Sequence, residues 1–278
     1  MSYQTHLYLL FTIALTYKIT HRAYSKSKTL TKSAAIIAFL MGTSSLYFKP
    51  IIGIQLLSFF YLGKLVTKYG KKEKLLIEND FSEKRDVFQV LANGGVSWVL
   101  ILWDQFGPNI FGPLKINENT LILTSLASFS ACLGDTFSSE LGILAESKPR
   151  LITNPFKIVP KGTNGGVTLN GLIASILGGS SLGIITFVFN LSFFSHQLNY
   201  PKILFISSTS GLLGSLIDSY LGAIFEYSGI DKKSKKVTNL KSRGEKVPIV
   251  ENFGILSGNG VNFLSSVLTA FIAYSCFL

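Results

Sequence analysis

The stretch that decides the fold is residues 167–194, VTLNGLIASILGGSSLGIITFVFNLSFF, which contains no Asp, Glu, Lys or Arg. A helix needs about 20 consecutive apolar residues to cross a bilayer, and this stretch supplies them. The rest of the 278-residue chain has the same character, since 47% of its residues are hydrophobic and 15% are charged. An ordinary soluble domain carries about 25% charged residues. The composition therefore predicts an all-α, polytopic transmembrane helical bundle, and its 22 Phe exclude a disordered chain.

Apolar segments recur along the whole chain, and no soluble domain fits between them. Two of them, residues 7–17 and 120–134, are shorter than a usual span, and we expect the second to continue through Glu140. We therefore predict about six to eight spans in a single integral membrane domain, residues 1–278. The segments are 7–17, 33–48, 51–66, 87–103, 120–134, 167–194, 203–227 and 252–278.

The basic residues are concentrated in every second loop between these segments. Residues 18–32, 64–86, 146–161 and 231–246 hold 23 of the 26 Lys and Arg. Cytoplasmic loops of membrane proteins carry such an excess. The pattern predicts that both termini are non-cytoplasmic, and it explains the net charge of +11 without a nucleic-acid partner. The predicted cytoplasmic loops are about 18–32, 67–86, 146–166 and 228–250, and the default compartment is the endoplasmic reticulum membrane.

Three carboxylates stand within or at the ends of apolar segments, where ionisable residues are costly and usually functional. Asp135 and Glu140 belong to Gly134–Gly142, and Asp218 belongs to Gly214–Gly222. The predicted topology puts all three near the cytoplasmic face. Oxygen ligands gathered at one depth suit a hard cation such as Mg²⁺. The alternative is that each carboxylate makes a helix-packing hydrogen bond.

The two carboxylate segments also resemble each other. Ser-Ser-Glu-Leu-Gly at 138–142 aligns with Asp-Ser-Tyr-Leu-Gly at 218–222, which fits either an internal duplication or chance. A stripe of small residues at 211, 214, 215 and 222 accompanies Asp218 and aims its carboxylate inward. Asn93, Asn259 and Asn262 are expected at the same depth, either as substrate-binding groups or as packing and interface residues.

A Gly-rich loop leads into the 167–194 segment. Such a loop before a helix can hold a phosphate with its backbone N–H groups, although the spacing is not that of a nucleotide-binding P-loop. The alternative is a flexible turn that starts the next span. Arg150 is a candidate for a second phosphate contact or simply a residue of the basic loop. The loop residues are Lys161, Gly162, Thr163, Asn164, Gly165 and Gly166.

Five motifs follow one another along the chain. They are KRDVFQVLANGG (84–95), LGDTFSSELG (133–142), PRLIT (149–153), VPKGTNGGVT (159–168) and GSLIDSYLGA (214–223). Together they resemble the transmembrane protein 19 family, from about residue 22 to the end of the chain. The segment 257–262 departs from the last motif of that family, which is richer in Asn and Asp.

The resemblance implies a function, because one branch of that family includes the plant phytyl-phosphate kinase. By this resemblance, the chain would transfer a phosphoryl group from CTP or ATP to a prenyl phosphate at the cytoplasmic face. Asp135, Glu140 and Asp218 would hold Mg²⁺ on the nucleotide, the Gly-rich loop would bind phosphate, and Arg150 would neutralise developing charge. Two alternatives stay open: a transporter of an anionic or phosphorylated lipid, and a non-catalytic multi-pass membrane protein.

Overall fold

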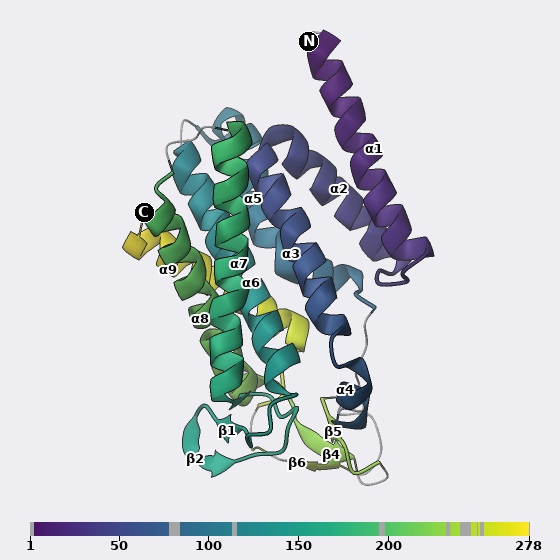
Figure 1. Ribbon diagram of the computed structural model, residues 1–278, viewed down its shortest axis with the longest axis vertical. Coiled ribbons are helices and arrows are strands. Elements are labelled where there is room, and N and C mark those ends of the chain that lie inside the picture. Colours follow the sequence, from purple (N-terminus) through teal and green to yellow (C-terminus); the bar gives the residue numbers. More distant parts are fainter. Residues whose placement is uncertain are drawn as a thin grey trace.

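The computed structural model describes residues 3–77, 84–112, 116–194, 198–231, 234–239, 246–248, 250 and 253–277. Parts of the predicted loops at 67–86 and 228–250 lie outside the described residues. Within those residues the chain forms nine α-helices and two small three-stranded sheets, and the helices assemble into one bundle (Figure 1). The predicted all-α membrane bundle is confirmed.

Each apolar segment of the sequence forms one long helix. By length and composition α3, α5, α6 and α7 can cross a membrane, so the predicted six to eight spans are confirmed in part. The long helices are α1 (Tyr3–Ser25), α2 (Lys32–Phe48), α3 (Pro50–Lys68), α5 (Val87–Phe111), α6 (Glu118–Gly142), α7 (Leu169–Phe189), α8 (Tyr200–Phe225) and α9 (Gly258–Phe277). Helix α4 (Lys71–Ile77) is short, and α7 continues into a π-helical turn, Asn190–Phe194.

Several helices begin at a polar residue that satisfies the free N–H groups of the first turn. The side chain of Thr31 accepts a hydrogen bond from Ala34 N at the start of α2. Asp86 does the same for α5 and Thr168 for α7. Since a Ser, Thr, Asp or Asn at this position stabilises a helix by about 1 kcal/mol, these starts are set by the local sequence.

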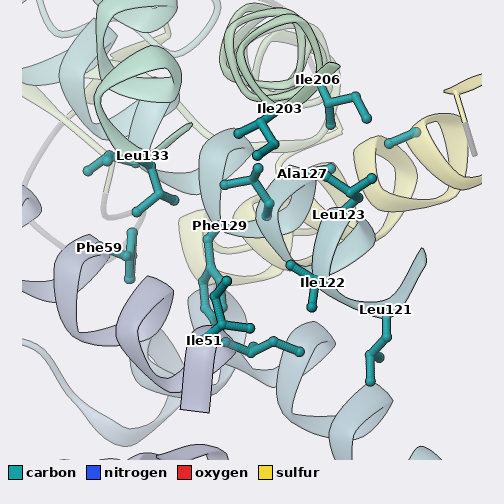
Figure 2. Close-up of a cluster of buried hydrophobic side chains, with 14 of the residues drawn as sticks. Ile51, Phe59, Leu121, Ile122, Leu123, Ala127, Phe129, Leu133, Ile203 and Ile206 are labelled. Atoms are coloured by element: carbon teal, nitrogen blue, oxygen red, sulfur yellow. The ribbon is translucent and has the colours of Figure 1, made fainter. Parts of the chain in front are cut away.

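Helix α6 is the centre of the bundle and packs against α3, α5, α7, α8 and α9. Every residue from Leu121 to Gly134 is buried. Figure 2 shows Phe129 and Leu133 of α6 in one apolar cluster with Ile51 and Phe59 of α3. A helix that is apolar on all sides is covered on all sides, which explains why α6 lacks the one-sided pattern of a surface helix.

Small residues allow α6 and α8 to approach each other closely. A Cβ added to Gly134 would lie 2.5 Å from the carbonyl oxygen of Gly211, and one added to Gly214 would collide with Ala131. Helices in membranes associate through such small residues because no hydrophobic effect drives them together. The two contacts correspond to each other under a shift of 80 positions along the sequence. The shift takes 134 to 214 and 131 to 211, so the contact of Gly134 with Gly211 matches that of Gly214 with Ala131.

Helices α6 and α8 also begin two units with the same order of elements. In the first, β1 (Arg150–Leu151) lies between β2 (Asn154–Ile158) and β3 (Gly166–Val167), and α7 follows. In the second, β4 (Gly229–Asp231) lies between β5 (Val237–Thr238) and β6 (Lys246–Pro248), and α9 follows. All strand pairs are antiparallel. The shared topology and the reciprocal glycine contacts support an internal duplication.

Both sheets and α4 lie at one end of the bundle, opposite the N-terminus, and we name it the strand end (Figure 1). The sequence predicts plain loops at residues 146–166 and 228–250, so the two sheets are an addition to the predicted fold. Helix α1 lies at the edge of the bundle and packs against α2. The strand end is therefore the only part of the described chain where strands lie beside the ends of the helices.

Candidate functional site

A cavity of about 260 Å³ opens at the strand end, between α6, α8 and the loop that precedes α7. We name it the polar pocket. It brings together two of the predicted carboxylates and the Gly-rich loop, which come from three separate segments of the sequence. The side chains and backbone that define it are those of Asp135, Ser138, Thr163, Asn164, Gly165, Asp218, Ser219 and Glu226.

Asp135 on α6 and Asp218 on α8 both line the polar pocket, and each has a polar partner. Ser215 is hydrogen-bonded to Asp135. Ser265 of α9 donates to Asp218 Oδ2 at 3.2 Å, and Asn262, with its amide nitrogen toward α8, donates to the same oxygen at 3.0 Å. The two carboxylates are close enough to interact electrostatically. Neighbouring carboxylates away from water repel each other, so the pair favours binding of a cation.

Glu226 is a third carboxylate of the polar pocket, and it is not among the residues predicted from the sequence. It follows the last residue of α8, and a Cβ added to Gly258 at the start of α9 would lie 3.1 Å from its Oε1. Burial, and then the nearby Asp218 carboxylate, raise the pKa of Glu226 to about 7. The sequence contains a signal for Glu226. Positions 218, 222 and 226 are spaced four residues apart, so Glu226 continues the polar stripe of α8.

The charge of the polar pocket fits a cation better than a bare anion. Among the described residues no Lys or Arg lines it. The N-terminus of α7, capped by Thr168, borders it and contributes partial positive charge. No three His, Cys, Asp or Glu side chains of the described chain converge tightly enough to hold a metal alone. Mg²⁺ usually takes one or two carboxylates and fills its other positions with water and ligand oxygens, so Asp135 and Asp218 are the residues that could hold such an ion.

The Gly-rich loop forms one wall of the polar pocket and is ordered by its own contacts. The N–H groups of Thr163 and Gly166 donate to carbonyl oxygens within the loop, and Asn164 N donates to Ser228 Oγ at 3.0 Å. Gly165 has φ +78° and lies so close to α8 that no Cβ fits. The loop is thus a fixed turn, and these three N–H groups are already bonded. Half of the six N–H groups of the predicted cradle are therefore already used within the protein.

The two basic residues predicted to contact phosphate do not line the polar pocket. Arg150 is exposed on β1, and its Nη1 donates to Pro155 O at 2.8 Å. Lys161 is partly exposed at the start of the Gly-rich loop, where Gly162 with φ +85° turns the chain into the pocket wall. The structure therefore brings the loop to the carboxylates without bringing these two cations to them.

Glu140 faces away from the polar pocket. Its Oε2 lies 2.5 Å from Nζ of Lys74, whose side chain is 1% exposed and also donates to Val66 O at 3.1 Å. This ion pair attaches α4 to the ends of α3 and α6. Positions 135 and 140 are about 140° apart around a helix, so both cannot face one cavity. The structure does not bring Glu140 together with Asp135 and Asp218.

Two of the three predicted asparagines link α5 and α9 to the polar pocket. The amide of Asn262 lies 3.4 Å from Asn93 Oδ1 and, at its other atom, 3.0 Å from Asp218 Oδ2. Asn93 is buried and Asn262 is partly buried. Asn259 instead lines a shallow groove with Phe88 and Phe263, outside the polar pocket. Asn262 therefore positions Asp218, and Asn93 lies beside Asn262.

The helical bundle and the carboxylate-lined cavity at its end define a multi-pass integral membrane protein with a polar site. The chain belongs to the family described as integral membrane protein DUF92, whose model matches residues 14–270. With the relatives described next, this confirms the resemblance to the transmembrane protein 19 family.

Relatives of the chain include proteins of a plant and of an archaeon. Protein PGR of Arabidopsis thaliana is 36% identical over 275 residues, which are 95% of this chain and 94% of that protein. An uncharacterized membrane protein of Methanocaldococcus jannaschii is 37% identical over 207 residues, 74% of this chain and 78% of its own length. Protein VTE6, chloroplastic, of Arabidopsis thaliana is 28% identical over 218 residues, 76% and 59% of the two chains. No solved structure matches the chain.

Proposed function

We propose that this protein is a membrane-embedded kinase that transfers a phosphoryl group from CTP or ATP to a prenyl phosphate at the polar pocket, with Mg²⁺. The observation that carries the proposal is the meeting of Asp135, Asp218 and Glu226 in one cavity beside the N-terminus of α7. The transmembrane protein 19 family, which includes the plant phytyl-phosphate kinase, supports the same class of reaction.

In phosphoryl transfer a protein mainly positions the reactants and stabilises charge. Asp135 and Asp218 would hold Mg²⁺, which neutralises the nucleotide phosphates. The hydroxyls of Ser138 and Ser219 and the N-terminus of α7 supply donors for phosphate oxygens. Arg150 and Lys161 lie outside the lining, so the proposal does not depend on them.

The position of the polar pocket supports a kinase over a transporter. A secondary transporter usually holds its substrate near the middle of the membrane, whereas the polar pocket lies at the strand end. That end carries the loops in which Lys and Arg are concentrated, so we propose that it faces the cytoplasm. The endoplasmic reticulum membrane is the default proposal for the compartment.

The direct test is turnover by purified protein in phosphatidylcholine nanodiscs. With phytyl or farnesyl monophosphate, Mg²⁺ and CTP or ATP, we expect formation of the prenyl diphosphate. Asp218→Asn should lower kcat by about 10²–10³-fold, the usual loss when a group that stabilises transition-state charge is removed. Its thermal unfolding should stay unchanged, because the amide keeps the shape of the carboxylate.

The control is Glu73→Gln, an exposed carboxylate on α4, which should retain full activity. No turnover by wild-type protein with either nucleotide, or full turnover by Asp218→Asn, would contradict the kinase. Transport is measured with the same protein in vesicles of the same phosphatidylcholine. If it moves a labelled lipid phosphate across the vesicle membrane without forming product, the transporter alternative is supported instead.

A further inference from the structure

A second cavity, of about 60 Å³, lies between α1, α2, α3 and α5. Its walls are mainly aliphatic and aromatic, with Leu30, Met41, Leu56, Phe60 and Val90 among them. No residue of α6, α7, α8 or α9 lines it, so it is separate from the polar pocket. We name it the apolar cavity.

Helix α1 covers one side of the apolar cavity and is attached mainly at α2. Its buried face is a row of threonines, of which Thr16 bonds to Thr43 of α2 at 2.6 Å. Among the described residues α1 makes no comparably extensive contact with α3 or α5. Figure 1 shows α1 diverging from the bundle toward its N-terminus. Helix α1 is thus the wall of the apolar cavity that is least attached to the rest of the bundle.

The apolar cavity ends in a group of basic side chains. Arg85 and Phe60 line both this cavity and a small hollow next to it, whose other walls include Lys64 and Lys68. Lys64 lies within electrostatic range of Lys68 and of Arg22 on α1. Like charges held together in a partly buried place repel unless an anion lies between them. We name Lys64, Lys68 and Arg85 the basic rim.

Arg85 is the member of the basic rim with the clearest need for an anion. Its guanidinium carbon lies 5.8 Å from the Phe60 ring centroid, and Nη2 would lie 3.1 Å from a Cβ added to Gly63. Burial lowers the pKa of Arg85, and the charge of Glu140 acts in the opposite direction from a distance. Among the described residues the guanidinium has no hydrogen-bond or ion-pair partner. The Arg85 side chain is partly exposed, and its five N–H donors can bind the oxygens of an anion at the rim.

We propose that the apolar cavity and the basic rim together bind a single-chain anionic lipid, with its phosphate on the rim and the first carbons of its chain in the cavity. The chemistry that would be recognised is a phosphate monoester on a linear or isoprenoid hydrocarbon. A volume of about 60 Å³ takes only the start of such a chain. The remaining carbons extend between α1 and α5 into the bilayer.

The apolar cavity adjoins the polar pocket through one pair of side chains. Asn93 lines the apolar cavity and lies against Asn262 of α9. Asn262 also contacts Asp218 of the polar pocket. The apolar cavity and the polar pocket are thus neighbours through Asn93 and Asn262, so a lipid held in the cavity would be a candidate phosphoryl acceptor of the proposed reaction. Its identity as the phosphoryl acceptor rests on the proposed function, whereas its binding does not.

The test is equilibrium binding of radiolabelled dodecyl phosphate to the full chain in phosphatidylcholine nanodiscs. We expect unlabelled dodecyl phosphate to displace the labelled compound at a concentration at least about tenfold lower than dodecanol or inorganic phosphate does. Only dodecyl phosphate contacts both the cavity and the rim. Arg85→Gln should weaken binding about tenfold, and Arg85→Lys should be intermediate because it keeps the charge and loses the planar fork. The matched control is Lys72→Gln, an exposed cation of α4, which should bind as wild type.

Equal competition by dodecanol would mean that no anion is recognised, and equal competition by inorganic phosphate would mean that no chain is recognised; each overturns the proposal. If Arg85→Gln unfolds at a lower temperature than wild type, the double variant Lys64→Gln/Lys68→Gln replaces it, and unchanged affinity there overturns the proposal. Binding without any kinase activity supports this site and contradicts the proposed function. Kinase activity without such binding does the reverse.

Discussion

The polar pocket and the basic rim of the apolar cavity lie in one bundle and have opposite charge. The pocket gathers Asp135, Asp218 and Glu226 without a lining cation among the described residues. The rim gathers Lys64, Lys68 and Arg85, and Glu140, the carboxylate whose charge reaches Arg85, is already paired with Lys74. A ligand of the opposite sign would stabilise each group of like charges. Whether a buried charge is already paired within the protein therefore indicates, better than its burial does, whether that charge binds a ligand.

The largest effect expected from this comparison concerns the ion pair that separates the two regions. Lys74→Met should destabilise the protein by about 3 kcal/mol, because it leaves the Glu140 carboxylate without its partner. The double variant Lys74→Met/Glu140→Gln should recover most of that loss. Thermal unfolding in nanodiscs measures both. Activity per folded molecule should stay near wild type in the double variant.

The opposite result would support the Mg²⁺-binding role that the sequence predicts for Glu140. If Glu140→Gln alone removes Mg²⁺-dependent turnover while unfolding is unchanged, then Glu140 belongs with Asp135 and Asp218 in the reaction, as the sequence pattern indicates. The comparison between a ligand-binding side and a structural side of α6 would then be wrong.

A smaller effect is expected at the carboxylate that completes the polar pocket. Glu226→Gln should raise the Mg²⁺ concentration for half-maximal activity by about tenfold, the usual effect of losing a charge that supports a metal site. Excess Mg²⁺ should restore kcat. The matched control is Glu146→Gln, an exposed carboxylate just beyond α6, which should change nothing. An unaltered Mg²⁺ dependence in Glu226→Gln would limit the site to Asp135 and Asp218.

The smallest effect is expected at the Gly-rich loop. Lys161 does not line the polar pocket, so Lys161→Met should change the nucleotide KM by less than about fivefold, as for other exposed charges. Lys148→Met, an exposed cation nearby, provides the baseline. A rise in KM well above that of Lys148→Met would show that Lys161 reaches the phosphates of the bound nucleotide, which is the role that the sequence predicts for it.

Hydrophobicity made most of the fold predictable. A span must satisfy its own backbone hydrogen bonds, so each apolar segment had to form a helix. The sheets at 150–167 and 229–248 were not foreseen, because strands of two to five residues carry no periodic pattern. Their pairing depends on where α6 and α8 end, which local sequence does not state.

The candidate site was predictable in part. Asp135 and Asp218 stood out because a carboxylate inside an apolar segment is costly, and the structure brings them into one cavity. Glu226 was hidden by its place at a helix end, where acidic residues are common. Arg85 stood in a basic loop, where charge is expected for topological reasons, so its position at the end of the apolar cavity could not be read from its neighbours.

The sequence by itself determined that this chain is a bundle of membrane helices with acidic residues at costly positions, because the energy of placing a residue in a bilayer depends mainly on that residue and its neighbours. Only the tertiary structure decided which acidic residues share a cavity. Asp135 and Glu140 look alike in the chain, yet rotation along α6 turns one to Asp218 and the other to Lys74. Electrostatic partnership depends on distance in space, and distances between helices are set by close contacts such as Gly134 with Gly211.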